Sequence, residues 1–233
     1  MAPRSNNKGK PRKFKSKVKA RSLGRREPLR TTGKTILIVC EDSKSSPDYF
    51  IKFRNELRLR SVNVEICGKE CGPAPISVID FAKKRKEEVK TSSIRDEYDE
   101  IFCVVDIDEH ETDQAIQKAR DNDLKIIISN PCFEYWYILH FERTGKSYSS
   151  RPKLYSSLKS HLNKHGYKHN KSGCDFFDVI YQRTETAIKN SNEILRSQYH
   201  NEPDLRKCNP STHVHRVVEC MRNIAAMSLQ RIR

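Results

Sequence analysis

The chain has 233 residues, of which 36% are apolar and 32% are charged, so it is long enough for one sizeable domain and apolar enough to form a core. No run approaches the ~20 apolar residues that a membrane-spanning helix needs, and the basic N-terminus lacks the apolar core of a secretory signal. These features exclude an integral membrane protein, and we expect a cytoplasmic protein whose eight cysteines are reduced.

The net charge of +15 is concentrated at one end of the chain, because residues 1–35 contain 13 Lys or Arg and a single acidic residue. Residues 1–34 have almost no apolar side chains, so we expect a disordered basic tail. Two roles fit such a tail: it keeps the protein soluble, or it captures nucleic acid through the phosphates. The cations predicted for the second role are Lys13, Lys15, Arg25 and Arg26.

Strands and helices alternate in the pattern that follows the tail. Strands are predicted at 36–40, 62–66, 101–105 and 124–128, with helices beginning near residues 46, 76, 111 and 131. The first and third strands are continuous apolar runs, which are typical of strands buried in a parallel sheet. The alternation favours an α/β fold with a mainly parallel sheet flanked by helices.

From about residue 146 the pattern becomes helical, and residues 146–233 are predicted to form a C-terminal region that packs on the core. Helices are expected at 152–165, 176–198 and 211–231. His161, His165 and His169 recur every fourth residue, which fits either a basic surface facing phosphate or a metal site. Their Lys-rich surroundings favour the phosphate-facing surface.

Carboxylates follow two of the predicted buried strands. Glu41 ends the first strand, and Asp106 and Asp108 end the third. The carboxyl ends of parallel strands share one edge of a sheet, where α/β proteins place their ligand sites. Convergent carboxylates select a hard cation such as Mg²⁺ or Mn²⁺, and such a site favours phosphodiester cleavage. The alternative is that these acids only cap the helices that follow.

The order of these motifs resembles a known family. A strand ending in Glu, followed by a strand ending in Asp-x-Asp, is similar to the Toprim domain of topoisomerases, primases and related nucleases. The longer motifs resemble the RloB-like family, which includes a component of the AbiL abortive-infection system (AbiLii). They are Ile36-Leu-Ile-Val-Cys-Glu41, Pro47-x-Tyr49-Phe50, Val105-Asp-Ile-Asp-Glu-His110 and Ser129-Asn-Pro-Cys-Phe-Glu-Tyr-Trp136.

The resemblance implies a Toprim-like core at residues 35–145 and an Mg²⁺-dependent nuclease that acts on DNA or RNA, tRNA included, in anti-phage defence. It also implies a partner ATPase of the ABC or AAA type. Glu41 is the expected general acid/base and a metal ligand, and Asp106 and Asp108 are the expected metal ligands. Glu134 and Asn130 are expected to complete the site.

Three further residues near the motifs are candidates. His110 follows the acids directly and is a candidate for proton transfer or for supporting the metal ligands. Lys44 and Lys168 are candidates for nucleic-acid binding. Tyr135, Trp136 and Tyr137 surround Glu134 and are expected to be core residues rather than a base-stacking platform.

The first motif departs from the family pattern, which usually has Gly after the Glu and a second Glu just before the Pro. Here those positions are Asp42 and Ser46. Either Asp42 replaces the missing carboxylate, or the site is degenerate and the protein is a non-catalytic module that binds nucleic acid or a partner. The sequence leaves open whether the protein forms a homo-oligomer.

Overall fold

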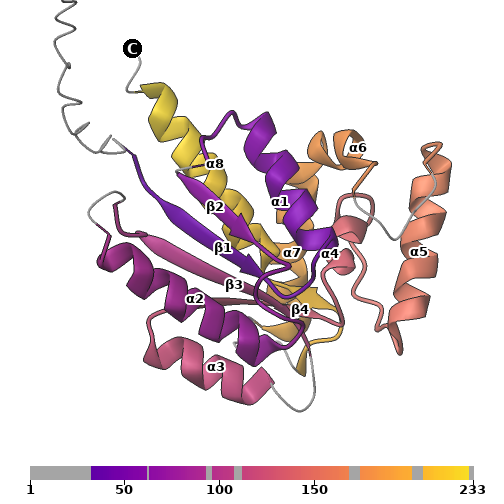
Figure 1. Cartoon of the computed structure of the whole chain (residues 1–233). Coiled ribbons are helices and arrows are strands. Elements are labelled where there is room, and N and C mark those ends of the chain that lie inside the picture. The colour runs from indigo at the N-terminus through magenta and orange to yellow at the C-terminus, as the bar shows by residue number, and fades with distance from the viewer. Residues whose placement is uncertain are drawn as a thin grey trace, which may run out of the picture.

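The computed structural model describes residues 33–61, 63–92, 96–107, 112–167, 174–200 and 207–230. These residues form a five-stranded sheet in the order β2-β1-β3-β4-β5, flanked by helices (Figure 1). Strands β1 to β4 are parallel, and β5 runs antiparallel to β4. The predicted fold class is therefore confirmed: this is a mixed α/β arrangement with a mainly parallel sheet and a helical C-terminal region, consistent with a Toprim-like fold.

The strands lie close to their predicted positions. They are β1 (Ile36–Cys40), β2 (Val64–Cys67), β3 (Glu100–Asp106), β4 (Lys125–Asn130) and β5 (Ser211–Thr212). Strand β1 lies between β2 and β3, and each of its five side chains is fully buried. Its unbroken apolar run therefore reflects burial on both faces of the sheet.

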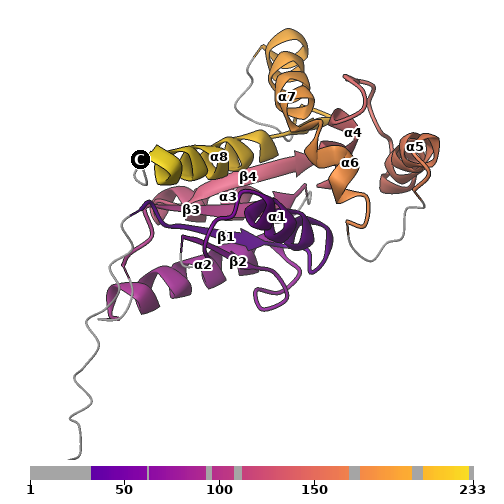
Figure 2. The ribbon, with the colours of Figure 1, turned by 90° about the horizontal axis from the view of Figure 1, so that it is seen from above.

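Helices cover both faces of the sheet. They are α1 (Ser45–Glu56), α2 (Pro75–Lys90), α3 (Thr112–Asp121), α4 (Glu134–Leu139), α5 (Arg151–Lys164), α6 (Phe177–Tyr181), α7 (Thr184–Tyr199) and α8 (Val214–Gln230). Leu37 and Val39 of β1 share a buried apolar cluster with α2 and α3. Ile36 and Ile38 share the opposite cluster with α1 and with α4 to α8. Figure 2 shows α2 and α8 on opposite sides of the sheet, with α4 and α5 beyond the end of β4.

The C-terminal region differs from its prediction at two places. The helix expected at 176–198 is divided into α6 and α7, and the hydroxyl of Thr184 donates to the carbonyl of Tyr181 at 2.7 Å where α7 begins. The helix expected at 211–231 begins only at Val214, because Ser211 and Thr212 pair with β4 as β5. The C-terminal region therefore contributes a strand to the sheet.

The aromatic residues of α4 belong to the core, as predicted. Tyr135, Trp136 and Tyr137 are at most 1% exposed. His161 and His165 stack on Phe141, with ring centroids 5.5 and 5.3 Å away, while His169 lies outside the described residues. The spacing of four residues therefore places both rings against Phe141.

Two predictions about the class of protein can also be checked. All eight cysteines are free thiols. In the part of the chain that the structure describes, no helix combines the length and apolar character needed to cross a bilayer.

Candidate active site

Glu41 and Asp106 come together because β1 and β3 are parallel neighbours. The amide of Glu41 donates to the carbonyl of Val104 at 2.9 Å, which continues the pairing of the two strands by one residue. The Glu41 side chain then turns toward β3, where its Oε2 accepts a hydrogen bond of 2.9 Å from the amide of Asp106. The two carboxylates therefore lie at the carboxyl edge of the sheet, where the sequence places them.

Asp106 joins three elements of the fold through its carboxylate. Its Oδ1 accepts a hydrogen bond of 2.9 Å from the amide of Phe133, in the turn between β4 and α4. Its Oδ2 lies 3.5 Å from Nη2 of Arg151, the first residue of α5. The side chain retains 18% of its solvent exposure, so it is accessible to a small ion.

Glu134 reaches the same edge from the start of α4 and is 9% exposed. The hydroxyl of Ser45 donates to its Oε1 at 2.9 Å. The hydroxyl of Tyr137 donates in turn to the backbone carbonyl of Ser45 at 2.8 Å. These two bonds hold the first residue of α1 against α4, so the position of Glu134 is set by both helices.

The electrostatic field of this edge acts on Asp106. Burial, and after it the negative charge of Glu134, raise the pKa of Asp106 well above its ordinary value; Arg151 opposes this rise, and Glu41 and Asp42 add to it. The positive charge of Arg151 therefore does not balance the negative charges of the carboxylates at this edge. A further positive charge placed among them would stabilise the ionised form of Asp106.

The carboxylate of Asp42 makes hydrogen bonds at the start of α1. Its Oδ1 accepts from the amide of Lys44 at 2.8 Å, and both its oxygens accept from the amide of Ser46 at 3.1–3.2 Å. The hydroxyl of Ser46 also donates to Oδ2. The carboxylate of Asp42 therefore accepts the free amides of Lys44 and Ser46 at the start of this helix.

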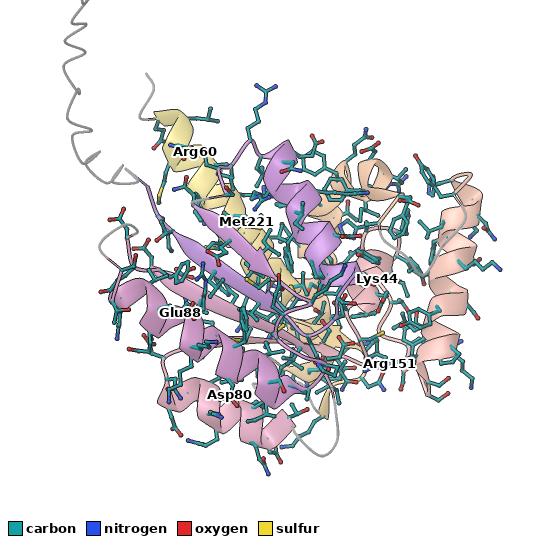
Figure 3. All side chains as sticks on the ribbon, viewed as in Figure 1. Lys44, Arg60, Asp80, Glu88, Arg151 and Met221 are labelled. Atoms are coloured by element: carbon teal, nitrogen blue, oxygen red, sulfur yellow. The ribbon has the colours of Figure 1, made fainter. Side chains whose placement is uncertain are left out.

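The remaining predicted residues divide into two groups. Lys44 is exposed just before α1, and Asn130 is buried at the end of β4, paired with Ser211 of β5. Figure 3 labels Lys44 and Arg151 at the same end of the sheet. The other predicted residues lie outside the described residues: Lys13, Lys15, Arg25, Arg26, Asp108, His110 and Lys168.

Sequence reasoning missed the contribution of α5. Arg151 contacts Asp106, and Tyr155, one turn later, is half-buried. Burial, followed by the charge of Glu134, raises the pKa of Tyr155, and Asp106 and Arg151 also act on it. A signal for this was present: Arg151 precedes a proline at the start of the helix, where a cation is unfavourable unless an acid compensates it.

The donors at this edge fit a hard divalent cation. Glu41, Asp106 and Glu134 offer only carboxylate oxygens, and Mg²⁺ is typically held by one or two carboxylates together with waters and substrate phosphates. Within the described ranges, no group of three or more His, Cys, Asp or Glu residues is placed so that it could hold a metal ion. The fit is therefore one of ligand chemistry only, and the described carboxylates do not make up a metal site by themselves.

The comparisons with known proteins identify the family. Searches of curated proteins and of solved structures returned no significant match. The family model described as RloB-like protein matches residues 36–221, a span that runs from β1 into α8 and includes every carboxylate described above. The chain therefore belongs to the RloB-like family.

Proposed function

We propose that this RloB-like protein is a metal-dependent nuclease that hydrolyses phosphodiester bonds in DNA or RNA, tRNA included. The observation that supports the proposal best is the contact of Glu41 with Asp106 at the carboxyl edge of the sheet, together with Glu134, whose negative charge lies near enough to raise the pKa of Asp106. Partly buried carboxylates that repel one another are costly without a cation. A metal ion bound together with a phosphodiester substrate would supply this cation.

In this proposal, Asp106 and Glu41 hold Mg²⁺ or Mn²⁺, and Asp108 is the predicted further ligand. A divalent ion held there would supply Lewis-acid polarisation of a phosphoryl oxygen and a water of lowered pKa. Glu41 accepts the proton of the attacking water as general base. The hydrogen bond from the Asp106 amide to Glu41 Oε2 orients this carboxylate beside the ligand. Glu134, held by Ser45, adds negative charge that strengthens cation binding.

The biological setting that we propose follows from the family alone. RloB-like proteins are expected to act as effectors of anti-phage defence in the cytoplasm beside a partner ATPase of the ABC or AAA type. Restraint or triggering by such a partner would control when the nuclease acts. The basic residues of the first 34 positions suit electrostatic capture of the nucleic acid.

A second function, a binding module without catalysis, is favoured by one specific observation. Asp42 is the residue that would replace the acid missing from the family pattern, yet its carboxylate accepts hydrogen bonds from Lys44 and Ser46 at the start of α1. If the ligands that remain do not hold a metal ion, the core would bind nucleic acid or a partner only.

Cleavage and metal binding, measured on the same samples, separate these functions. Wild type, Asp106→Ala and Asp106→Ala/Asp108→Ala are titrated with Mg²⁺ or Mn²⁺, and cleavage of DNA and of total tRNA is followed. Asp80→Asn is the matched control, since Asp80 is also paired with one cation, Lys118, but lies on α2 outside the acidic edge. Loss of both metal binding and cleavage in the Asp106 variants alone supports the nuclease. Undiminished cleavage by Asp106→Ala would refute it, and absence of metal binding by wild type favours the binding module.

A further inference from the structure

Arg151 and Lys153 lie on different faces of α5. Leu154, Leu158 and Leu162 follow Arg151 by three, seven and eleven residues, and all three are fully buried. Residues at this spacing lie on one face of a helix. Arg151 therefore lies on the face that α5 turns toward the rest of the protein, whereas Lys153 is exposed on the opposite face.

The guanidinium of Arg151 lies between the carboxylate edge and solvent. Its Nη2 is 3.5 Å from Oδ2 of Asp106, and its side chain keeps 49% of its exposure. An arginine carries five N–H donors in a rigid fork, so one contact with Asp106 leaves capacity for a second acceptor. Tyr155, four residues later, lies on the same face and is half-buried, and Arg151 and Asp106 both act on its pKa.

The segment that leads into α5 is held on both sides. The side-chain amide of Asn209 pairs with the backbone of Tyr148: Oδ1 accepts from its N–H at 3.2 Å, and Nδ2 donates to its carbonyl at 3.1 Å. The hydroxyl of Tyr135 donates to the carbonyl of Thr144 at 2.7 Å. These bonds fix the start of α5, so Arg151 is presented to the edge by a preorganised segment rather than by a free loop.

Stability does not explain this arrangement. An ion pair with a half-exposed arginine contributes little, and a cation in the first turn of a helix opposes the helix dipole. Recognition of an anion does explain it, because arginine binds phosphate through two parallel hydrogen bonds. The phosphate would lie beside Asp106, where the proposed reaction needs it.

We propose that Arg151, with the neighbouring hydroxyl of Tyr155, forms a phosphate-binding subsite that holds a backbone phosphate of a nucleic acid next to Asp106. The inference rests on the proposed function only for the identity of the ligand as nucleic acid. Arg151 donates to the non-bridging oxygens, and Asn209 acts through the 144–150 segment as a positioning residue.

Binding without cleavage tests this subsite. Short labelled single-stranded DNA and RNA are titrated with Ca²⁺ in place of Mg²⁺, and in parallel in EDTA, by fluorescence anisotropy at several salt concentrations, into full-length wild type, Arg151→Ala, Arg151→Lys and Lys153→Ala. Lys153→Ala removes the same charge from the same turn of α5, but from its solvent face. Arg151→Ala should weaken binding about tenfold, as expected for a lost charged hydrogen bond, and lower the salt slope by about 0.7. Lys153→Ala should weaken binding less than about twofold, and Arg151→Lys should be intermediate because lysine lacks the fork.

The outcomes distinguish this inference from the nuclease proposal. Equal affinities of Arg151→Ala and Lys153→Ala, with thermal midpoints like that of wild type, would overturn the subsite even if wild type cleaves nucleic acid. So would the absence of oligonucleotide binding by wild type. Selective loss in Arg151→Ala supports the subsite even if no variant cleaves. Asn209→Ala should lower affinity in the same direction and by less, with the loss enlarged when urea is added below the unfolding transition.

Discussion

Replacement of Asp106 by asparagine should make the metal-free protein more stable at neutral pH. The amide has nearly the shape of the carboxylate, and its oxygen can still accept the hydrogen bond from the Phe133 amide. The substitution removes a partly buried negative charge that is repelled by the negative charges of Glu134, Glu41 and Asp42. The ion pair that is lost is with Arg151, whose side chain is 49% exposed, so this loss is the smaller effect.

The pH dependence gives this prediction its sign. Because the pKa of Asp106 is raised in the folded protein, its contribution to stability is fully present below the ordinary value of 3.8 and is lost as the pH rises through the folded value. Asparagine does not titrate. The thermal midpoint of Asp106→Asn should therefore exceed that of wild type most at neutral pH, and the difference should shrink as the pH falls toward 4.

Mg²⁺ should stabilise wild type much more than Asp106→Asn. Mg²⁺ at 100 times its Kd stabilises a protein by about 2.7 kcal/mol, and for a folded part of this size that raises the midpoint by about 5–11 °C. Wild type and the control Asp80→Asn should show this shift, whereas Asp106→Asn should shift by less than about 2 °C. Differential scanning fluorimetry, with and without Mg²⁺, measures all three proteins. A metal-free Asp106→Asn that is less stable than wild type at pH 7, or equal Mg²⁺ shifts in wild type and the variant, would refute the reasoning.

The remaining predictions concern the residues that support the site. Asp42→Ala should cost about 1–2 kcal/mol of stability in urea unfolding, as for the loss of a helix cap, and should leave the Mg²⁺ shift unchanged; a lost shift would instead make Asp42 a metal ligand. Asn209→Ala should cost about 1–3 kcal/mol through its two hydrogen bonds to Tyr148, and an unchanged urea midpoint would contradict this. Burial lowers the pKa of His140 from 6.5 to about 3, so wild type should lose stability as the pH falls through this range. His140→Phe should make that dependence shallower without abolishing it, because burial also lowers the pKa of His213 to about 3 and of His215 to about 4. Parallel pH profiles of the two proteins would exclude a contribution of His140.

The part of the site that could be predicted from the sequence depends on strand patterns. The continuous apolar runs that precede Glu41 and Asp106 indicate buried parallel strands, and adjacent parallel strands bring their carboxyl ends to one edge. The contact between Glu41 and the Asp106 amide is the form that this proximity takes. The positions of the two strands and their parallel direction were therefore sufficient to predict that these two residues lie close together.

The parts that could not be predicted depend on tertiary pairing. Ser211 and Thr212 follow Asn-Pro and look like a helix start, but the hydroxyl of Thr212 pairs with Ser129 of β4 at 2.8 Å, and the backbone forms β5. A two-residue strand has no periodicity of its own. Arg151 contacts Asp106 because α5 packs against α4, the helix that follows β4, and no local pattern encodes that approach.

The two residues that depart from the family motif also interact in the structure. Asp42 and Ser46, the two residues that differ from the pattern, bond to each other at the start of α1. The exchange thus keeps one carboxylate in this turn but moves it from the residue before Pro47 to the residue after Glu41. At its present position the carboxylate caps the helix, as an acid in a first turn favourably does. In the function proposed above, the cation would then be held by Glu41 and Asp106, with Glu134 nearby and Asp108 as the predicted addition. Because Asp106 contacts Arg151, the catalytic proposal and the phosphate subsite meet at this side chain.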